Sequence, residues 1–184
     1  MENIQAFLEE LKLDNKIKLE DIPTIDLYMD QVIQLFDHSF SNGKEKTLTK
    51  TMINNYAKAK LFFSVQNKKY TKEHIILMSL IYQLKGTLSI NDIKATLKGI
   101  NEKTVEEAFD LEQFYSAYLG IVDQNVDRFK EDVSERVKEV SQVIGEDTKD
   151  SKLIHNTLLI ASLSHISTLY KNAAEKLVRE MEED

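Results

Sequence analysis

The chain has 184 residues, of which 42% are hydrophobic and 30% charged, and its formal net charge at pH 7 is −7. This length and apolar content suffice for a packed core, and apolar residues recur at helical spacing throughout, which excludes a disordered acidic tail. The sequence contains no cysteine, which excludes disulfides, thiolate metal sites and cysteine nucleophiles.

The apolar residues do not form targeting or membrane segments. The N-terminus, Met1 to Ile4, leads directly into an amphipathic pattern, without the basic start and long apolar stretch of a signal peptide. The uncharged stretch from Leu153 to Tyr170 approaches the length of a membrane span, but it contains many His, Asn, Ser and Thr side chains. We therefore expect a cytoplasmic protein that does not enter the membrane.

The expected fold class is all-α, because one proline and five glycines interrupt the chain and few stretches alternate as strands do. A short N-terminal amphipathic helix within residues 1–22 is indicated by one apolar stripe, which consists of Ile4, Phe7, Leu8 and Leu11. After Pro23, a second helix is expected from Ile25 to about Asp37, followed by a polar loop over residues 39–46.

Two helices in the middle of the chain have clear start and stop signals. Thr71 is placed to cap the first of them, which is expected to end at Gly86. Ser89 is placed to cap the second, with Asp92 in its first turn near the positive end of the helix dipole. Gly99 is expected to end this second helix.

Residues 101–184 are expected to form a C-terminal helical region. Residues 104–143 predict one long helix, or two that break near Gly120, and residues 151–182 predict another, with a connecting turn over 145–150. The apolar stripes along these helices exceed what a small monomer readily covers. We expect this region to form a homodimer, or to hold a small-molecule or protein effector.

Charge is distributed unevenly along the chain. Residues 1–43 carry a net charge of −6 and residues 101–184 one of −9, whereas residues 44–100 hold eleven lysines against three acidic residues, a net charge of +8. A solvated lysine face is the ordinary explanation of such a cluster. Binding to a polyanion such as DNA is the functional explanation, because it draws on clustered basic residues.

One short helix in this basic segment has an unusual outer face. Thr47 or Thr49 is available to cap it, and its inner face consists of Met52, Ile53 and Tyr56. Its outer face consists of Thr51, Asn54, Asn55 and Lys58. Adjacent asparagines are poor helix formers, but their amides can pair with adenine in the major groove. The residue types suit either a DNA-recognition helix or an ordinary polar face.

This helix and the segment after it resemble the DNA-binding domain of MerR-type regulators. Leu48 to Phe62 is similar to that family's recognition helix with its Thr-Leu-Arg-Tyr-Tyr motif, and Lys69-Tyr70 is similar to the Arg-Tyr that ends its wing. Thr71 to Leu97 is similar to the family's long helix, the turn after it and the final leucine. The resemblance implies a MerR-like winged helix-turn-helix domain over residues 23–100.

Three segments also resemble domain-of-unknown-function family 1836, a group of uncharacterised bacterial proteins. They are Ile25 to Val32, Leu48 to Tyr56, and Lys69-Tyr70. This resemblance supports the same architecture and implies no ligand or reaction.

These patterns together predict a DNA-binding transcriptional regulator of MerR-like type that reads double-stranded DNA with the helix Thr49–Lys60. Base reading is expected from Thr51, Asn54 and Asn55, and contacts to phosphate or guanine from Lys50 and Lys58. Backbone contacts are expected from Lys68, Lys69, Tyr70 and Lys72. The alternative is a helical protein–protein interaction module that retains the scaffold without binding DNA.

No residue pattern indicates an enzyme, a cofactor site or a metal site. The sequence has no nucleophile motif, no glycine-rich phosphate loop and no pair of carboxylates with an evident task. His155 and His165 are separated by about 80° around one expected helix, so they are expected to be structural rather than metal ligands.

Overall fold

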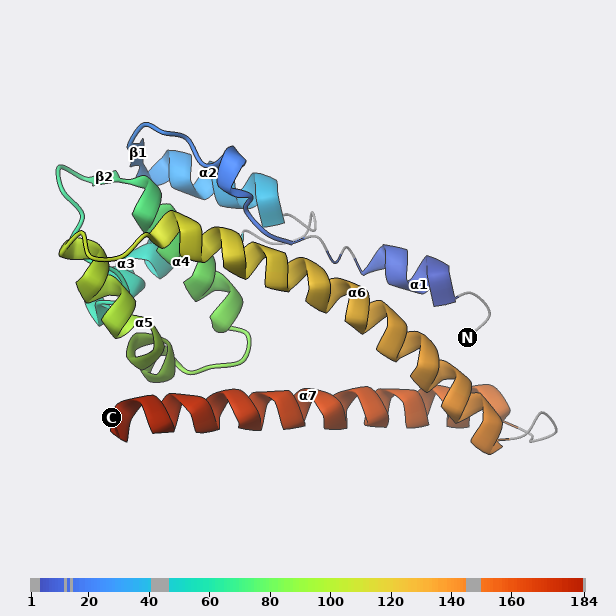
Figure 1. The fold of residues 1–184 in the computed structure, drawn as a ribbon. Coiled ribbons are helices and arrows are strands. Elements are labelled where there is room, and N and C mark those ends of the chain that lie inside the picture. The colour runs from blue at the N-terminus through green and yellow to red at the C-terminus, as the bar shows by residue number, and fades with distance from the viewer. Residues whose placement is uncertain (1–3, 12, 14, 41–46, 145–149, 184) are drawn as a thin grey trace. The chain divides into compact units, whose positions relative to one another are not determined.

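The structure is a computed structural model and describes residues 4–11, 13, 15–40, 47–144 and 150–183. These residues form seven α-helices, a 3₁₀ turn and two short strands (Figure 1). Their bounds are α1 Ile4–Glu10, η1 Leu19–Asp21, β1 Leu27–Tyr28, α2 Met29–Phe40, α3 Lys50–Ala59, β2 Lys69–Tyr70, α4 Lys72–Leu84, α5 Ile90–Val105, α6 Leu111–Ile144 and α7 Ser151–Glu183. The predicted all-α fold class is confirmed.

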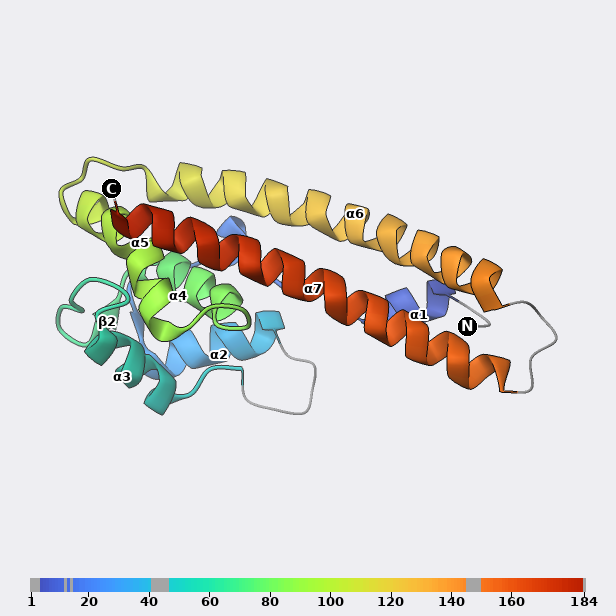
Figure 2. The same ribbon diagram turned by 90° about the horizontal axis from the view of Figure 1, so that it is seen from below.

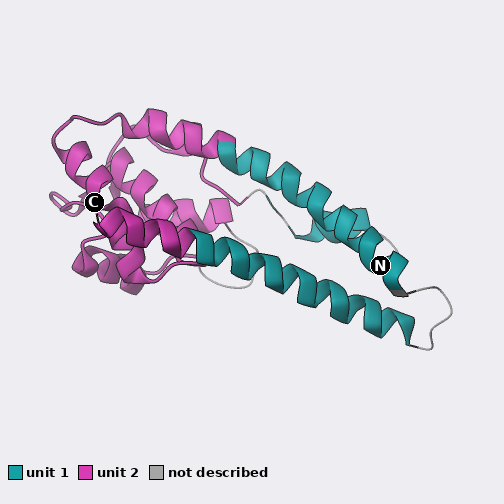
Figure 3. Cartoon of the chain, turned by 60° about the horizontal axis from the view of Figure 1, so that its bottom comes forward, with its two compact units in different colours: residues 1–14, 121–173 teal, residues 15–120, 174–184 magenta. Residues whose placement is uncertain are grey.

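The chain divides into two compact units, which Figure 3 shows in two colours. Unit 1 comprises residues 1–14 and 121–173, and unit 2 comprises residues 15–120 and 174–184. Each boundary in the C-terminal half falls inside a long helix, so each unit contains part of α6 and part of α7.

A strand replaces the start that was expected for the second helix. Strand β1 pairs antiparallel with β2, so the chain stays extended up to Tyr28. Helix α2 begins at Met29, and the side chain of Gln31 accepts the backbone N–H of Tyr28 at 2.8 Å. The start expected at Ile25 was wrong, because hydrogen bonds to β2 take the place of a first helical turn.

Helix α3 uses one of its two candidate caps. The side chain of Thr49 accepts the N–H of Met52 at 3.2 Å, which satisfies a donor that the first turn leaves free. At the other end, Lys60 has a left-handed backbone with φ 56°, and the chain closes with hydrogen bonds back to the last turn. The loop expected before α3 starts later than predicted, because α2 continues to Phe40, and residues 41–46 lie outside the described residues.

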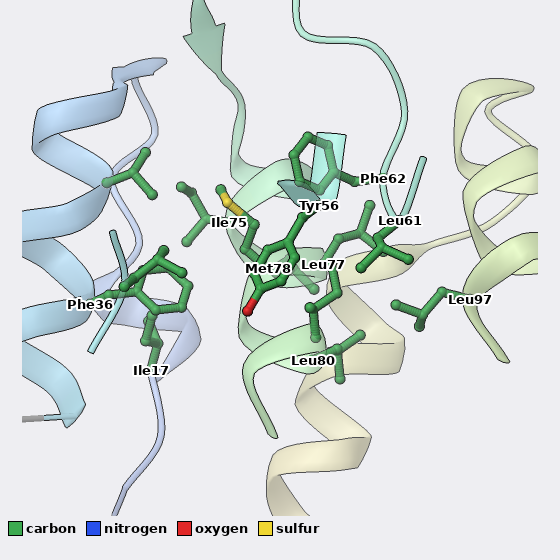
Figure 4. Close-up of a cluster of buried hydrophobic side chains, with 14 of the residues drawn as sticks. Ile17, Phe36, Tyr56, Leu61, Phe62, Ile75, Leu77, Met78, Leu80 and Leu97 are labelled. Atoms are coloured by element: carbon green, nitrogen blue, oxygen red, sulfur yellow. The ribbon is translucent and has the colours of Figure 1, made fainter. Parts of the chain in front are cut away.

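Helix α4 lies at the centre of the core of unit 2. Its residues from His74 to Ile81 are all buried, so the helix is covered on every side instead of on one apolar face. Figure 4 shows its apolar side chains among residues from other elements, such as Phe36 of α2, Tyr56 of α3 and Leu97 of α5. The surface of unit 2 is therefore formed by the elements around α4.

Side chains also fix the extended segment that precedes η1. Gln83 Nε2 of α4 donates to the carbonyl of Asn15 at 2.6 Å, and the Tyr115 hydroxyl of α6 donates to the carbonyl of Ile17 at 2.7 Å. These bonds satisfy backbone groups that lie in neither a helix nor a strand.

Helix α5 begins as predicted but ends later. Ser89 accepts the N–H of Asp92, and the Asp92 carboxylate accepts the N–H of Ser89, so the two form a capping box. The helix then continues through Gly99 to Val105. The stop predicted at Gly99 was wrong, because the left-handed residue that closes the helix is Glu107, with φ 55°.

The long helix expected over residues 104–143 is α6, which is unbroken and starts at Leu111. The Asp110 carboxylate accepts the N–H of Gln113 at 2.9 Å and so provides the cap. A break near Gly120 is not present, and a side chain added there would meet open space. Helix α7 agrees with the prediction for the last helix. Of the turn expected over residues 145–150, the structure describes Asp150 alone.

Unit 1 contains a hairpin formed by the part of α6 after Gly120 and the part of α7 before Ala174, which run side by side in Figure 2. Arg136 binds both carboxylate oxygens of Asp132 at 2.7 and 2.8 Å and donates to Ser162 Oγ at 3.1 Å. Several large apolar side chains stay exposed, namely Ile121, Val143, Leu153, Ile160 and Tyr170. Across the described ranges, no helix is long and apolar enough to span a bilayer.

The buried side chain of His74 joins α4 to the segment before β2. Its ring lies 4.0 to 5.9 Å, between centroids, from three aromatic rings, those of Phe62, Phe63 and Tyr70. Nδ1 accepts the N–H of Thr71 at 3.1 Å, which leaves Nε2 to donate to the carbonyl of Phe63 at 3.3 Å. The imidazole is therefore neutral in the folded protein and holds this tautomer.

We expect His74 to make the free energy of unfolding sensitive to acid. Burial lowers the pKa of His74, and the hydrogen bond to Phe63 and the carboxylates of Glu73 and Asp26 oppose this only in part. The unfolded chain binds more protons below the ordinary pKa of 6.5, so stability that is present above this pH is lost as the pH falls toward the lower folded pKa.

His74→Gln retains an acceptor for Thr71 and a donor for Phe63 but does not titrate. Urea unfolding at pH 7 and pH 5 should therefore show a smaller loss of stability on acidification in the variant than in the wild type. Equal losses of stability in both proteins would contradict the attribution of the acid sensitivity to His74.

Candidate nucleic-acid interface

The outer face of α3 carries the residues predicted to read DNA. Ile53 and Tyr56 are buried and Met52 is half-buried, so this side of the helix faces the core. The opposite side consists of four exposed residues, Thr51, Asn54, Asn55 and Lys58. Within the described part of the chain, neither asparagine amide forms a hydrogen bond, so both amides are available to a ligand.

Two of the predicted lysines form ion pairs of different kinds. Lys50 Nζ lies 2.7 Å from Asp30 Oδ1, but both side chains are more than 60% exposed, so water screens the pair and a phosphate can replace it. Lys72 Nζ lies 2.7 Å from Glu112 Oε2, and its side chain is 21% exposed. Lys50 therefore remains available at the surface, whereas Lys72 links α4 to α6.

The two residues of strand β2 point to opposite sides. The Tyr70 ring is buried and packs against Phe62, so it belongs to the core, although the sequence predicted a contact with the DNA backbone. Lys69 is half-buried, and its Nζ lies 5.6 Å from the ring centroid of the exposed Tyr28 on β1. Of the two residues of β2, Lys69 therefore lies at the surface and Tyr70 in the core.

A tight turn before β2 presents Lys68 to solvent. Gln66 and Lys69 form a bridge, and the N–H of Lys69 donates to the carbonyl of Gln66 at 2.9 Å. The two residues between them, Asn67 and Lys68, have φ of 52° and 60°, as in a type I′ hairpin turn. Glycine is favoured at the second of these positions, and a residue with a Cβ there costs roughly 1–2 kcal/mol. Such strain is often retained where a side chain has a function.

Lys68→Gly is expected to stabilise the fold and weaken DNA binding. Relief of the left-handed strain, offset by the greater freedom of glycine in the unfolded chain, should raise the free energy of unfolding by about 0.5–1 kcal/mol. Loss of the charge should weaken binding to any duplex. Asn67→Gly is the matched control, because it relieves strain in the same turn and removes no charge. Equal DNA affinity of both variants, measured by anisotropy, would show that Lys68 has no such role.

Unit 2 also has a cavity of about 1020 Å³ beside α3. Its walls come from β1, α2, α3, β2, α5 and the segment between α3 and β2. Four lysines line it, namely Lys60, Lys68, Lys94 and Lys98. In the described ranges none of these four lysines takes part in an ion pair. The cavity lining therefore holds lysine charges that no ion pair within the described residues neutralises.

Three of these four lysines were not among the predicted site residues. Lys94 and Lys98 are four residues apart on the exposed side of α5, and Lys60 directly follows α3. All three belong to the basic segment that the charge distribution identified. The spacing of Lys94 and Lys98 could have indicated a shared helix face from the sequence alone. The proximity of these lysines to α3, however, depends on the tertiary fold.

The remaining cavity wall is largely apolar and aromatic, and it includes Tyr28, Phe62, Phe63 and Tyr70. Asn101 also lines it, and its Nδ2 donates to the carbonyls of Leu61 and Leu97, both at 3.0 Å. Two carboxylates, those of Asp30 and Glu102, reduce the formal charge of the lining to +2. These groups suit a ligand that combines negative charge with a flat apolar part.

Other polar clusters in the described ranges do not form a comparable site. No three His, Asp or Glu side chains in these ranges are grouped so that they could bind a metal ion. His74 and Tyr115 are buried, and both are engaged in hydrogen bonds that hold segments of unit 2 together. The surface around α3 and its cavity is therefore the candidate site.

The fold and this surface define a helical protein with a basic patch on a compact unit. Residues 17–118 match the sequence model of the family described as "Domain of unknown function (DUF1836)". The match spans more than half of the 184 residues, so the chain belongs to this family. No curated protein and no solved structure matched the chain.

Proposed function

We propose that the protein is a DNA-binding transcriptional regulator of MerR-like type that reads double-stranded DNA with α3. The observation that carries this proposal is the outer face of α3, where Asn54 and Asn55 are exposed and have no partner among the described residues. The order of elements supports it, because α2 and α3 are followed by the turn at Lys68, then by β2, α4 and α5. The resemblance to MerR-type regulators implies the same order.

In the proposed complex, α3 enters the major groove and the turn before β2 lies along the phosphate backbone. Thr51, Asn54 and Asn55 read base edges, since an asparagine amide can accept from and donate to adenine. Lys50 and Lys58 bind phosphate or guanine at the ends of α3. Lys68 and Lys69 bind phosphates beside the helix.

Lys72 and Tyr70 support this surface indirectly. Lys72 holds α4 to α6 through Glu112, and the buried Tyr70 ring packs against Phe62. The proposal therefore assigns neither of them a direct contact with DNA.

We further propose that a second copy of the chain covers the exposed apolar residues of unit 1. Leu153, Ile160 and Tyr170 of α7 are 65–72% exposed, and Val143 of α6 is 79% exposed. Burying such side chains is favourable, and a homodimer would present two α3 helices to two half-sites. Light scattering at tens of micromolar should give twice the chain mass of 21.3 kDa. A monomeric mass would contradict this part of the proposal.

The alternative function is a helical protein–protein interaction module. The same exposed apolar side chains favour it, because a partner protein or another effector could cover them in place of a second copy. The two functions differ in what the basic surface does. DNA binding requires Lys69 and its neighbours, whereas an interaction module leaves them solvated.

Lys69→Ala tests the proposed contact with phosphate. Loss of one phosphate contact should weaken binding to all duplexes alike and reduce the slope of log K against log salt by about 0.9. Anisotropy over a salt series, with a selected duplex and a scrambled one, measures both effects. Lys138→Ala, which removes an exposed lysine from α6, is the control and should leave both quantities unchanged. A wild-type protein without measurable duplex binding at low salt would favour the interaction module.

A further inference from the structure

The cavity beside α3 is an open hollow with the size of a small-molecule site. Its volume of about 1020 Å³ is near the upper end of the range in which drug-sized ligands bind, roughly 300–1,000 Å³. Phe62 and Tyr70 form part of its wall and are buried, so the aromatic surface is held in place by the core. Tyr28 adds a ring that is 55% exposed. The exposed Tyr28 ring provides a stacking surface for a flat apolar group.

The charge of the lining selects the kind of ligand. Four lysines line the cavity and outnumber its two carboxylates. Two of the lysines, Lys94 and Lys98, are on one exposed side of α5, and the other two, Lys60 and Lys68, come from the segment between α3 and β2. A ligand in the cavity would therefore lie near lysines from both of these parts of the chain. Negative charge on the ligand is therefore required for complementarity.

Backbone conformation gives a second reason to regard these lysines as functional. Lys60 and Lys68 both have left-handed φ values, 56° and 60°, at positions where glycine would relieve strain. Each lysine thus keeps a side chain on the cavity at a cost to the stability of the fold.

We infer that this cavity binds a small aromatic anion, with the flat part of the ligand against the exposed ring of Tyr28 and its anionic group at the lysines of the lining. The ligand also regulates DNA binding, an effect that rests on the proposed function. Asn54 and Lys68 line the cavity and belong to the proposed DNA-reading surface. A bound anion neutralises Lys68 and occupies the space beside Asn54, so the ligand and DNA compete.

Direct binding is tested with matched pairs of probes in the absence of DNA. The first pair is 1-naphthyl phosphate and 1-naphthol, and the second is adenosine monophosphate and adenosine. Calorimetric titration of the full-length protein should give one site per chain for at least one of the anions, with at least tenfold weaker binding of its neutral partner. The inference is overturned if neither anion binds more tightly than its neutral partner.

Two variants locate the binding site. Lys94→Gln and Lys98→Gln remove charges that line the cavity but are outside the proposed DNA contacts, and each should weaken binding of the anion about tenfold. Lys103→Gln removes an exposed lysine of the same helix that does not line the cavity, and it should have no effect. Equal loss in all three variants, or no loss in any, would overturn the assignment to this cavity.

Measuring anion binding and DNA binding separately distinguishes a failure of the proposed regulation from a failure of the proposed DNA-binding function. Asn55→Ala changes the outer face of α3 without touching the cavity, so it should weaken DNA binding and leave anion binding intact. If the anion binds but the wild type does not bind DNA, the site stands and the proposed function fails. If the wild type binds both the anion and DNA but the anion does not displace DNA, the proposed competition between the two ligands is refuted.

Discussion

Tyr115→Phe is expected to lower the free energy of unfolding by about 2–6 kcal/mol. The Tyr115 hydroxyl donates to the carbonyl of Ile17 at 2.7 Å and accepts from Ser79 Oγ at 2.8 Å. All three residues are at most 1% exposed. Phenylalanine would leave a carbonyl and a hydroxyl without partners where water does not reach, and each such group costs about 1–3 kcal/mol. Urea unfolding at neutral pH measures the change.

The effect should be specific to this hydroxyl. Burial raises the pKa of Tyr115 to about 12, so the group remains a donor at neutral pH. Tyr118 is the matched control, because its ring stacks on that of Tyr115 with centroids 5.9 Å apart and its hydroxyl has no hydrogen bond within the described ranges. Tyr118→Phe should cost less than about 0.5 kcal/mol. If Tyr115→Phe lowers the free energy of unfolding as little as Tyr118→Phe does, the buried hydrogen bonds do not hold the segment at Ile17.

Asn54→Ala is expected to remove discrimination between DNA sequences while leaving nonspecific binding intact. The loss of an amide pair with adenine should cost on the order of 1–3 kcal/mol at the preferred site, about 5- to 150-fold in affinity. Binding to a scrambled duplex and the salt dependence should stay nearly unchanged, because no charge is removed. Alanine favours the helix more than asparagine does, so a loss of affinity would not reflect unfolding of α3.

Asn172→Ala is the control for this variant, because Asn172 is an exposed asparagine of α7 and lies outside the proposed DNA contacts. It should bind both duplexes as the wild type does. Two outcomes would count against base reading by α3. One is an equal loss on the selected and scrambled duplexes with Asn54→Ala, and the other is no loss on either.

Local signals in the sequence predicted much of unit 2. The caps Thr49 and Ser89 are confirmed, because a side-chain oxygen next to free N–H groups acts over one turn and needs no tertiary context. The glycines at 99 and 120 misled the prediction of helix ends. Glycine costs a helix only about 1 kcal/mol, and the helices continue through both positions. The actual end of α5 uses Glu107 in a left-handed conformation, which the sequence pattern does not indicate.

The candidate site was predictable where it depends on a single helix. The spacing of residues 51–58 placed Asn54 and Asn55 on the face opposite Ile53, and the structure has them exposed. The cavity was not predictable, because it requires α5 to lie near α3 and near the segment before β2. Tyr70 illustrates the same limit. Its position beside lysines suggested a surface role, but the pairing of β1 with β2 turns its ring into the core.

Selection of DNA fragments by the purified protein tests whether α3 reads a specific DNA sequence. The full-length protein would be incubated with fragmented genomic DNA or a random duplex library at moderate salt, and the bound fraction sequenced over several rounds. We expect enrichment of a shared site with two half-sites that contain adenines, and loss of that enrichment with Asn54→Ala. Sequences recovered without a common site, together with weak binding that Lys69→Ala does not change, would contradict it.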